Sequence, residues 1–195
     1  METISFFKEE ILSELHKLNC SKSAGPDDLH PKLLYEIRHE ITEPLHHIFE
    51  LSFAESKVPS DWKTATVVPI FKKGDKSSPG NYRPVSLTSI ICKLFETIIR
   101  KRLVDHLDQN ELIFSEQYGF RRSCALQLLN VLEDWTKSLN ENNDTDVIYL
   151  DFSKAFDSVS HRRLTTKLHA YGIRGLFQHW TVGFLELQNS SCTCW

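Results

Sequence analysis

The chain has 195 residues and a mass of 22.6 kDa, a length that fits one domain and argues against a second large one. Hydrophobic residues make up 41% and charged residues 25%, which excludes collagen-like, low-complexity and mostly disordered chains. The net charge of −3 is unevenly distributed, because residues 62–103 carry +7 whereas residues 1–61 carry −6 and residues 104–195 carry −4. The middle of the chain is therefore a basic segment.

Three short helices are predicted in the first part of the chain. Apolar side chains recur at helical spacing over residues 7–18, where Ser5 is the candidate cap. Pro31 suits the first turn of a second helix, and Pro44 is expected to open a third that runs to Phe53.

A basic hairpin is predicted to follow. Residues 64–71 are rich in β-branched side chains, and residues 82–87 have the pattern of a returning strand. If the strands pair, Lys72, Lys73 and Arg83 would converge on a polyphosphate. The alternative is that these lysines belong to an ordinary solvated turn.

The second half is predicted to contain three helices and one strand. Thr88 or Ser89 is expected to cap the first helix, and the apolar stripe of the second, over residues 125–139, is expected to lie in the core. Ser160 is expected to cap the third helix and Gly172 to end it. These elements together predict one α+β body.

Asp151 is the most informative acid in the chain. It follows Val147–Leu150, whose consecutive apolar residues predict a strand covered on both faces. A carboxylate at the end of a buried strand needs hydrogen bonds or a cation, so Asp151 is either bonded to the following turn or a metal ligand. Asp157 is expected to make a structural hydrogen bond.

Other sequence features exclude several classes of protein. No apolar run is long enough to span a membrane, and the first residues lack the plan of a secretory signal. We therefore expect an intracellular protein, in the nucleus or cytoplasm, that is not secreted and has no membrane partner. The five scattered cysteines argue against a disulfide framework or a zinc site.

An ordered series of motifs resembles the reverse transcriptase domain of non-LTR (LINE-like) retrotransposons. The similar blocks are Lys22-Ser-Ala-Gly-Pro-Asp27 with Leu29-His-Pro31, Pro59-x-x-Trp62-Lys63, Val68-Pro-Ile-Phe-Lys-Lys-Gly-Asp75, Asn81-Tyr-Arg-Pro-Val-Ser-Leu87, Gln117-Tyr-Gly-Phe-Arg121 and Tyr149-Leu-Asp-Phe-Ser-Lys-Ala-Phe-Asp157. The resemblance implies an RNA-directed DNA polymerase that uses an RNA template, a DNA primer and deoxynucleoside triphosphates.

The implied fold is the fingers and partial palm of a right-hand polymerase, helix-rich, with the basic hairpin, a central palm strand and no thumb. It forms a single partial domain over residues 1–195. Residues 1–21 would form a lead-in helix, residues 22–145 mainly the fingers, and residues 146–195 the start of the palm with an atypical C-terminal tail.

The resemblance also implies roles for individual residues. Asp151 would be the catalytic aspartate that binds both Mg²⁺ ions of a two-metal site, and the backbone carbonyl of Phe152 would help to hold one of them. Lys73 and Arg83 would grip the triphosphate, with Lys72 nearby. Three further residues would belong to the nucleotide-binding set: Phe152, Ala155 and Phe156. Ala155 would leave room for the sugar, and Phe156 would exclude a 2′-hydroxyl.

The sequence departs from the family pattern in ways that bear on activity. Arg122 is followed directly by Ser123, without the usual glycine-containing spacer, and no aromatic-Ala-Asp-Asp motif is present. We therefore expect weak or absent Mg²⁺ binding, no polymerisation by this chain alone, and self-association through an exposed palm surface. The alternatives are a non-catalytic nucleic-acid-binding remnant of a retroelement and, less favoured, a metal hydrolase that uses Asp151 and Asp157.

Overall fold

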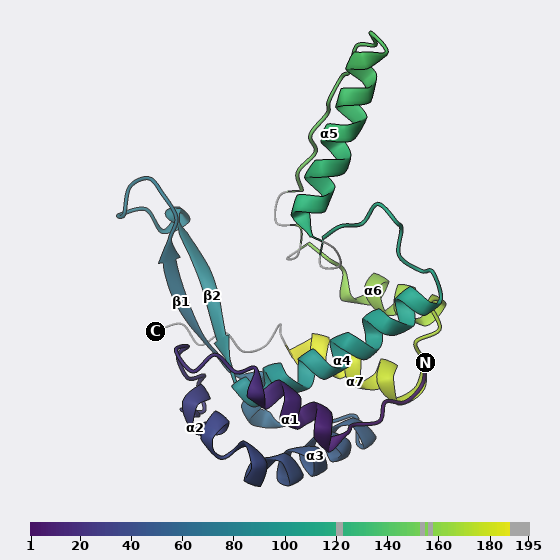
Figure 1. The fold of residues 1–195 in the computed structure, drawn as a ribbon. Coiled ribbons are helices and arrows are strands. Elements are labelled where there is room, and N and C mark those ends of the chain that lie inside the picture. The colour runs from purple at the N-terminus through teal and green to yellow at the C-terminus, as the bar shows by residue number, and fades with distance from the viewer. Residues whose placement is uncertain (120–122, 153–154, 156–157, 188–195) are drawn as a thin grey trace. The chain divides into compact units, whose positions relative to one another are not determined.

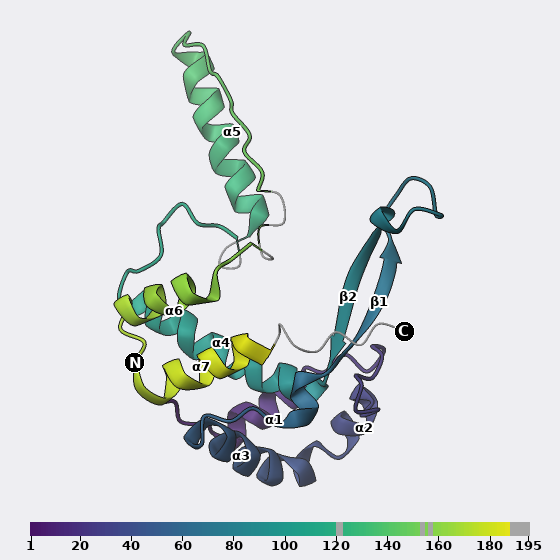
Figure 2. The same ribbon diagram turned by 180° about the vertical axis from the view of Figure 1, so that it is seen from behind.

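The computed structural model describes residues 1–119, 123–152, 155 and 158–187. Within them the chain has a helix-rich α+β fold with one two-stranded antiparallel sheet (Figures 1 and 2). The elements in chain order are α1 (Lys8–His16), α2 (Pro31–Glu36), α3 (Arg38–Ala54), the 3-10 helix η1 (Ser60–Lys63), β1 (Ala65–Phe71), the 3-10 helix η2 (Pro79–Asn81), β2 (Tyr82–Thr88), α4 (Ile90–Gln109), α5 (Cys124–Asn140), α6 (His161–Ala170) and α7 (Gly175–Leu187).

The chain forms two compact units. The first comprises Met1–His106 and the C-terminal part from Ser160, and the second comprises Leu107–Val159. In the first unit the helices form a body from which the β1–β2 hairpin extends as an arm (Figure 1). The domain boundaries predicted near residues 22 and 146 stay predictions.

Several helix ends lie where local sequence signals predicted them. Helix α2 begins at Pro31, and the preceding His30 side chain accepts a hydrogen bond from the Lys32 N–H. Ser160 caps α6 by accepting from the Arg163 N–H, and Gly172 follows that helix with φ of +81°. These three predictions are confirmed. The sequence could supply them because each depends on contacts within one helical turn.

Two predicted helix starts are wrong. Helix α1 begins at Lys8 after an extended Phe7, so Ser5 does not cap it. Pro44 lies inside α3, which already begins at Arg38. Thr42 is buried on the same face as Leu45, so packing of this face against the body holds the turn that precedes the proline. Tertiary contacts thus offset the backbone hydrogen bond that Pro44 cannot make.

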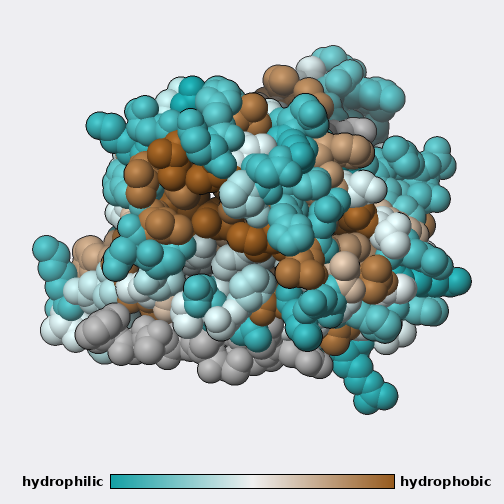
Figure 3. Space-filling model, turned by 90° about the horizontal axis from the view of Figure 1, so that it is seen from below, coloured by the Kyte–Doolittle hydropathy of each residue, from teal (hydrophilic) through white to brown (hydrophobic). Residues whose placement is uncertain are grey.

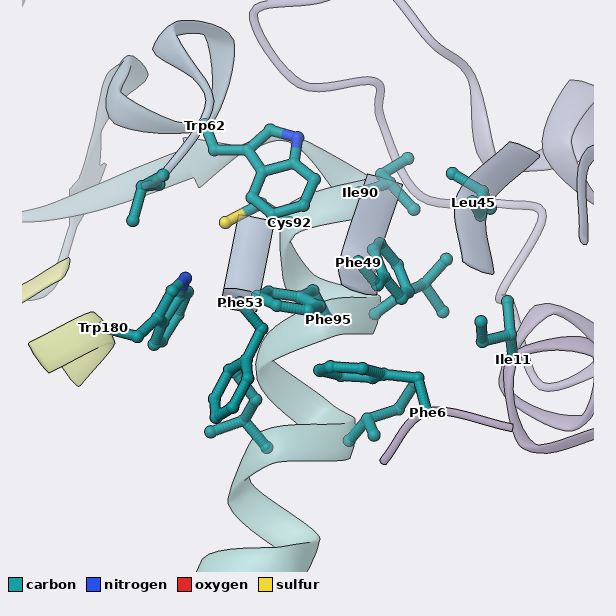
Figure 4. Packing of buried hydrophobic residues seen from close by; sticks show 14 of the residues in the cluster. Phe6, Ile11, Leu45, Phe49, Phe53, Trp62, Ile90, Cys92, Phe95 and Trp180 are labelled. Carbon is teal, nitrogen blue, oxygen red and sulfur yellow. The ribbon is translucent and has the colours of Figure 1, made fainter. Parts of the chain in front are cut away.

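One aromatic side chain lies at the centre of the core. Phe95, on α4, is completely buried, and four aromatic rings surround it (Figure 4). Its ring centroid lies 5.1 Å from Phe6, 4.7 Å from Phe49, 5.2 Å from Trp62 and 5.1 Å from Trp180. The N-terminal segment, α3, η1 and α7 are therefore joined through contacts with a single ring.

A buried hydrogen bond fixes the position of α7 against α3. The Trp180 indole Nε1 donates to Ser52 Oγ at 3.3 Å, and this hydroxyl donates to the Lys57 carbonyl at 2.6 Å. Trp180 also stacks on Phe184 within α7. The indole therefore contributes both apolar contact area and a satisfied polar group.

The surface of the first unit is mixed in polarity. Figure 3, which views the molecule from the side of α3, shows apolar side chains in patches between hydrophilic ones. The exposed apolar residues of α2 and α3 include Leu33, Ile48 and Leu51. Scattered exposure of this kind is usual for folded proteins.

The apolar stripe of α5 is exposed, contrary to prediction. Leu128, Leu129 and Leu139 are 65%, 61% and 72% exposed, and no described residue of α5 is buried. After α5 the chain runs back alongside the helix, where Thr145 Oγ1 donates to Ser138 Oγ (Figures 1 and 2). The stripe was expected in the core because amphipathic spacing indicates an apolar face, but spacing does not supply the element that covers it.

A close backbone approach explains one glycine of the Lys22–Asp27 motif. A Cβ built at Gly25 would lie 2.7 Å from the Thr88 carbonyl oxygen and 3.0 Å from the Ser89 Cα. Only glycine therefore lets this turn lie against the junction between β2 and α4, where the hairpin joins the body.

We predict that Phe95→Ala lowers the free energy of unfolding by about 3–5 kcal/mol, because it removes a ring that four others contact. Urea denaturation followed by tryptophan fluorescence measures the loss. Phe7→Ala is the matched control, since Phe7 is 54% exposed, and should cost less than about 1.5 kcal/mol. Should the alanine variant not fold, Phe95→Leu is expected to cost about 1–2 kcal/mol. Equal losses at positions 95 and 7 would contradict this account of the core.

We predict that Gly25→Ala destabilises the chain by about 1–3 kcal/mol, since the added methyl group must displace backbone atoms of residues 88 and 89. Thermal unfolding by circular dichroism measures the effect. Gly80→Ala is the control, because the nearest atom to its added Cβ, Ser78 Oγ, is 4.0 Å away, and it should change stability by less than about 0.5 kcal/mol. A neutral Gly25→Ala would refute the close approach.

Candidate functional site

The predicted hairpin is present, and its strand register shows which residue lies opposite the candidate cation Arg83. Strands β1 and β2 pair antiparallel over their full length, with Ile70 opposite Arg83. The Lys72 N–H donates to the Asn81 carbonyl at 2.9 Å, which closes the ladder beyond the last strand pair. Because side chains alternate along a strand, Lys72 and Arg83 lie on the same face of the hairpin.

Side-chain hydrogen bonds order the turn between the strands. Asn81 Nδ2 donates to the Asp75 carbonyl at 2.8 Å, and the Tyr82 hydroxyl donates to the Lys76 carbonyl at 2.9 Å. Gly74 has φ of +92°, a conformation that favours glycine. Asp75 Oδ1 accepts from the Ser77 N–H at 2.9 Å, and this bond lowers the pKa of the Asp75 carboxyl. The one acid of the turn is thus bonded to backbone.

The candidate nucleotide-binding cations of the hairpin are exposed. Lys72, Lys73 and Arg83 all face solvent, and none of them forms an ion pair with a carboxylate in the described part of the chain. Lys76 differs, since its ammonium lies 5.8 Å from the centroid of the Phe71 ring. The hairpin therefore presents three cations that remain available to an anionic ligand.

The second set of candidate residues, around Asp151, belongs to the other compact unit. The prediction of a strand before Asp151 is wrong. Residues 147–150 form no strand, and Ile148, Tyr149 and Leu150 are 82%, 83% and 85% exposed. The only sheet among the described residues is the β1–β2 pair of the first unit, so this apolar segment has no strand to pair with. A consecutive apolar run predicts a covered strand only where neighbouring strands exist.

Asp151 is consequently exposed rather than at the end of a buried strand. Phe152 is 80% exposed. Ala155 lies in a turn, where its carbonyl accepts from Ser158 Oγ at 3.2 Å. Phe156 and Asp157 lie outside the described residues. The roles assigned to this segment, and the convergence of the hairpin cations on a polyphosphate, stay predictions.

Asp151 is the candidate metal ligand of this segment. A carboxylate such as Asp151 is a suitable ligand for Mg²⁺, which prefers oxygen. No group of three or more histidine, cysteine, aspartate or glutamate side chains with metal-binding geometry occurs in the described ranges. The role of Asp151 as a metal ligand stays a prediction.

One buried titratable pair was not predicted from the sequence. Cys92 Sγ donates to Glu96 Oε1 at 3.1 Å, one turn apart on α4. Burial raises the pKa of the Cys92 thiol, as does the neighbouring Glu96, and burial also raises the pKa of Glu96 against the opposing effect of this hydrogen bond. The thiol is thus held protonated and unreactive. The spacing of four residues was the only signal for this pair.

No helix in the described part of the chain is both long and apolar enough to cross a membrane. This finding concerns helices of the described residues alone.

Comparisons with known proteins identify the family. The model of the reverse transcriptase (RNA-dependent DNA polymerase) family matches residues 70–194, more than half of the chain. The chain is 29% identical over 163 residues to a probable RNA-directed DNA polymerase from transposon BS of Drosophila melanogaster, and 33% identical over 162 residues to one from transposon X-element of the same fly. Each match covers 82% of this chain and 18% of the relative.

A further relative is the Pol polyprotein of the type-1 retrotransposable element R2 of Popillia japonica, 31% identical over 139 residues, which are 70% of this chain and 19% of the relative. The chain thus spans about a fifth of the length of these curated relatives. By this family match and these relatives, the chain belongs to the reverse transcriptase family, among the RNA-directed DNA polymerases of non-LTR retrotransposons.

Proposed function

We propose that this chain contributes the nucleotide-gripping hairpin and the first catalytic aspartate to an intracellular RNA-directed DNA polymerase. Such an enzyme extends a DNA primer on an RNA template with deoxynucleoside triphosphates. The observation that carries the proposal is the set of three exposed, unpaired hairpin cations inside the segment that the family model matches. Asp151 lies in the same matched segment.

The reaction joins the primer 3′-hydroxyl oxygen to the α-phosphorus of the incoming nucleotide and releases pyrophosphate. Catalysis requires stabilisation of the negative charge of the triphosphate, which increases on the leaving pyrophosphate as its bond to the α-phosphorus breaks. Lys73 and Arg83 would neutralise that charge, Lys as a point charge and Arg through paired hydrogen bonds, with Lys72 beside them.

Asp151 would supply one carboxylate to Mg²⁺ ions that activate the hydroxyl and neutralise the phosphates. The backbone carbonyl of Phe152 would be a further oxygen ligand. Ala155 would leave room for the sugar, and Phe156 would select deoxynucleotides by excluding a 2′-hydroxyl.

The second candidate function is a non-catalytic nucleic-acid-binding remnant of a retroelement. The observation that favours it is the net charge of +7 over residues 62–103. In this case the basic segment would still bind RNA or an RNA–DNA duplex through phosphates, and binding would weaken as salt increases. The two candidates differ in catalysis and in the ligand of the basic segment, which is a nucleoside triphosphate in the first and a nucleic-acid backbone in the second.

We predict that the double variant Lys73→Gln/Arg83→Gln weakens binding of a deoxynucleoside triphosphate at least about tenfold, since each charged hydrogen bond contributes about 1.5–3 kcal/mol. Isothermal titration calorimetry with the Mg²⁺ complex of the nucleotide measures the dissociation constant. Lys57→Gln is the control, because Lys57 is exposed and pairs with Glu55 away from the hairpin. A double variant that binds as tightly as the unchanged chain would remove the hairpin from the nucleotide site.

We predict that the 195-residue chain alone incorporates no nucleotide in a primer-extension assay with an RNA template and Mg²⁺, because one carboxylate cannot position two ions. Asp151→Asn should then behave like the unchanged chain. Incorporation by the unchanged chain that Asp151→Asn abolishes would refute the expected inactivity and would establish Asp151 as catalytic.

A further inference from the structure

Helix α6 has an unusual charge composition. Its ten residues, His161–Ala170, include two arginines, one lysine and two histidines, and none of them is acidic. It lies outside the basic segment 62–103, in a stretch of the chain that is acidic overall.

The cations of α6 occupy its exposed face. Leu164 and Leu168 are half-buried, Leu168 packs against the core, and α6 contacts α7. Arg162, Arg163 and Lys167 face solvent. Together with Ser160, Thr166 and Ala170, these three line a shallow, open depression of about 550 Å³.

These cations have no carboxylate partner, unlike five other cations of the same unit. Lys8 pairs with Glu43, Lys17 with Glu14 and Lys57 with Glu55, while Lys101 and Arg102 share Glu10. No ion pair joins Arg162, Arg163 or Lys167 to any carboxylate of the described residues. The Lys167 ammonium lies 5.4 Å from the Tyr171 ring centroid. Their charge is therefore available to an external anion.

The position of the arginines is unfavourable for the helix itself. Arg162 and Arg163 lie in the first turn, which contains no acid, and the positive end of the helix dipole disfavours cations there. Helix stability therefore does not account for two arginines at these positions. A bound anion would neutralise them.

We propose that the exposed face of α6, Arg162, Arg163 and Lys167, binds phosphates of a nucleic-acid backbone. This inference rests on the proposed function, because it assigns a second contact surface for the template–primer duplex beyond the nucleotide-binding hairpin. Arg163 and Lys167 are one helical turn apart, about 6 Å along the axis. Three cations on about one turn of helix can contact about two or three phosphates of a duplex.

The side chains of this face favour nucleic acid over a membrane surface. Its uncharged members are Ser160, Thr166 and Ala170, none of which is large and apolar. A peripheral membrane helix needs such residues to insert beneath the headgroups. Arginine also forms paired hydrogen bonds with phosphate oxygens.

The test measures binding of a fluorescently labelled RNA–DNA hybrid duplex to the full 195-residue chain by anisotropy, over a series of salt concentrations. The variant is Arg162→Gln/Arg163→Gln/Lys167→Gln. The matched control is Lys8→Gln/Lys17→Gln/Lys57→Gln, which changes the net charge equally but removes cations that already have carboxylate partners. Circular dichroism checks that both variants fold.

The α6 variant is expected to bind the hybrid at least about tenfold more weakly and to lower the slope of log affinity against log salt by about two to three units. The control variant should retain the slope and bind within about threefold of the unchanged chain. Should the glutamine variant not fold, two milder variants replace it. Arg162→Lys/Arg163→Lys keeps the charge and should preserve the slope of log affinity against log salt. A single Lys167→Gln should reduce this slope by about one unit.

Three outcomes would overturn the inference. The first is equal binding by the α6 and control variants, and the second is an equal loss of affinity for poly-glutamate, which would identify an acidic protein as the ligand. The third is no hybrid binding by the unchanged chain. Nucleotide binding by the hairpin is measured separately, so failure at α6 with intact nucleotide binding leaves the proposed function standing. Loss of nucleotide binding alone would overturn the hairpin assignment instead.

Discussion

The contact of four aromatic rings with Phe95 is the interaction on which the first unit depends. Phe6, Phe49, Trp62 and Trp180 come from segments far apart in the sequence, and each approaches the same buried ring of α4. Helix α4 follows β2 after a single residue, so the ring that holds the body together also anchors the hairpin. The side chains of a well-packed core resist displacement, so the end of the hairpin that joins α4 is held in place. The close approach of Gly25 to the β2–α4 junction adds a second contact at the same place.

The charges of the first unit are arranged in two ways. In one group, cations pair with nearby carboxylates and contribute little beyond local order; its members are Lys8, Lys17, Lys57, Lys101 and Arg102. On the hairpin and on the outer face of α6, cations have no carboxylate partner among the described residues. The one acid of the hairpin turn, Asp75, is bonded to the Ser77 backbone. For the unpaired cations of these two surfaces we propose anionic ligands, a nucleotide at the hairpin and a nucleic-acid backbone at α6.

The second unit shows the limit of hydrophobic patterns. The stripe of α5 and the run Val147–Leu150 both indicate burial, yet both are largely exposed. Such patterns record which side chains are apolar and how they are spaced. Burial requires a complementary element, and within the second unit the described residues supply only one helix and an irregular segment. The exposure of Asp151 and Phe152 has the same cause, since the predicted strand has no partner.

The sequence by itself determined the features that depend on neighbours along the chain. Pro31 at the start of α2, the Ser160 cap, Gly172 after α6 and the two hairpin strands were predicted because their causes act within a few residues. The motifs likewise identified the family and the hairpin cations. Only the tertiary structure decided that α3 continues through Pro44, that α7 exists and brings Trp180 to Phe95, and that Cys92 and Glu96 form a buried pair. It also left α6 with three exposed cations that have no carboxylate partner in the described part of the chain. These features depend on packing and on charges contributed by segments distant in sequence, which no local pattern encodes.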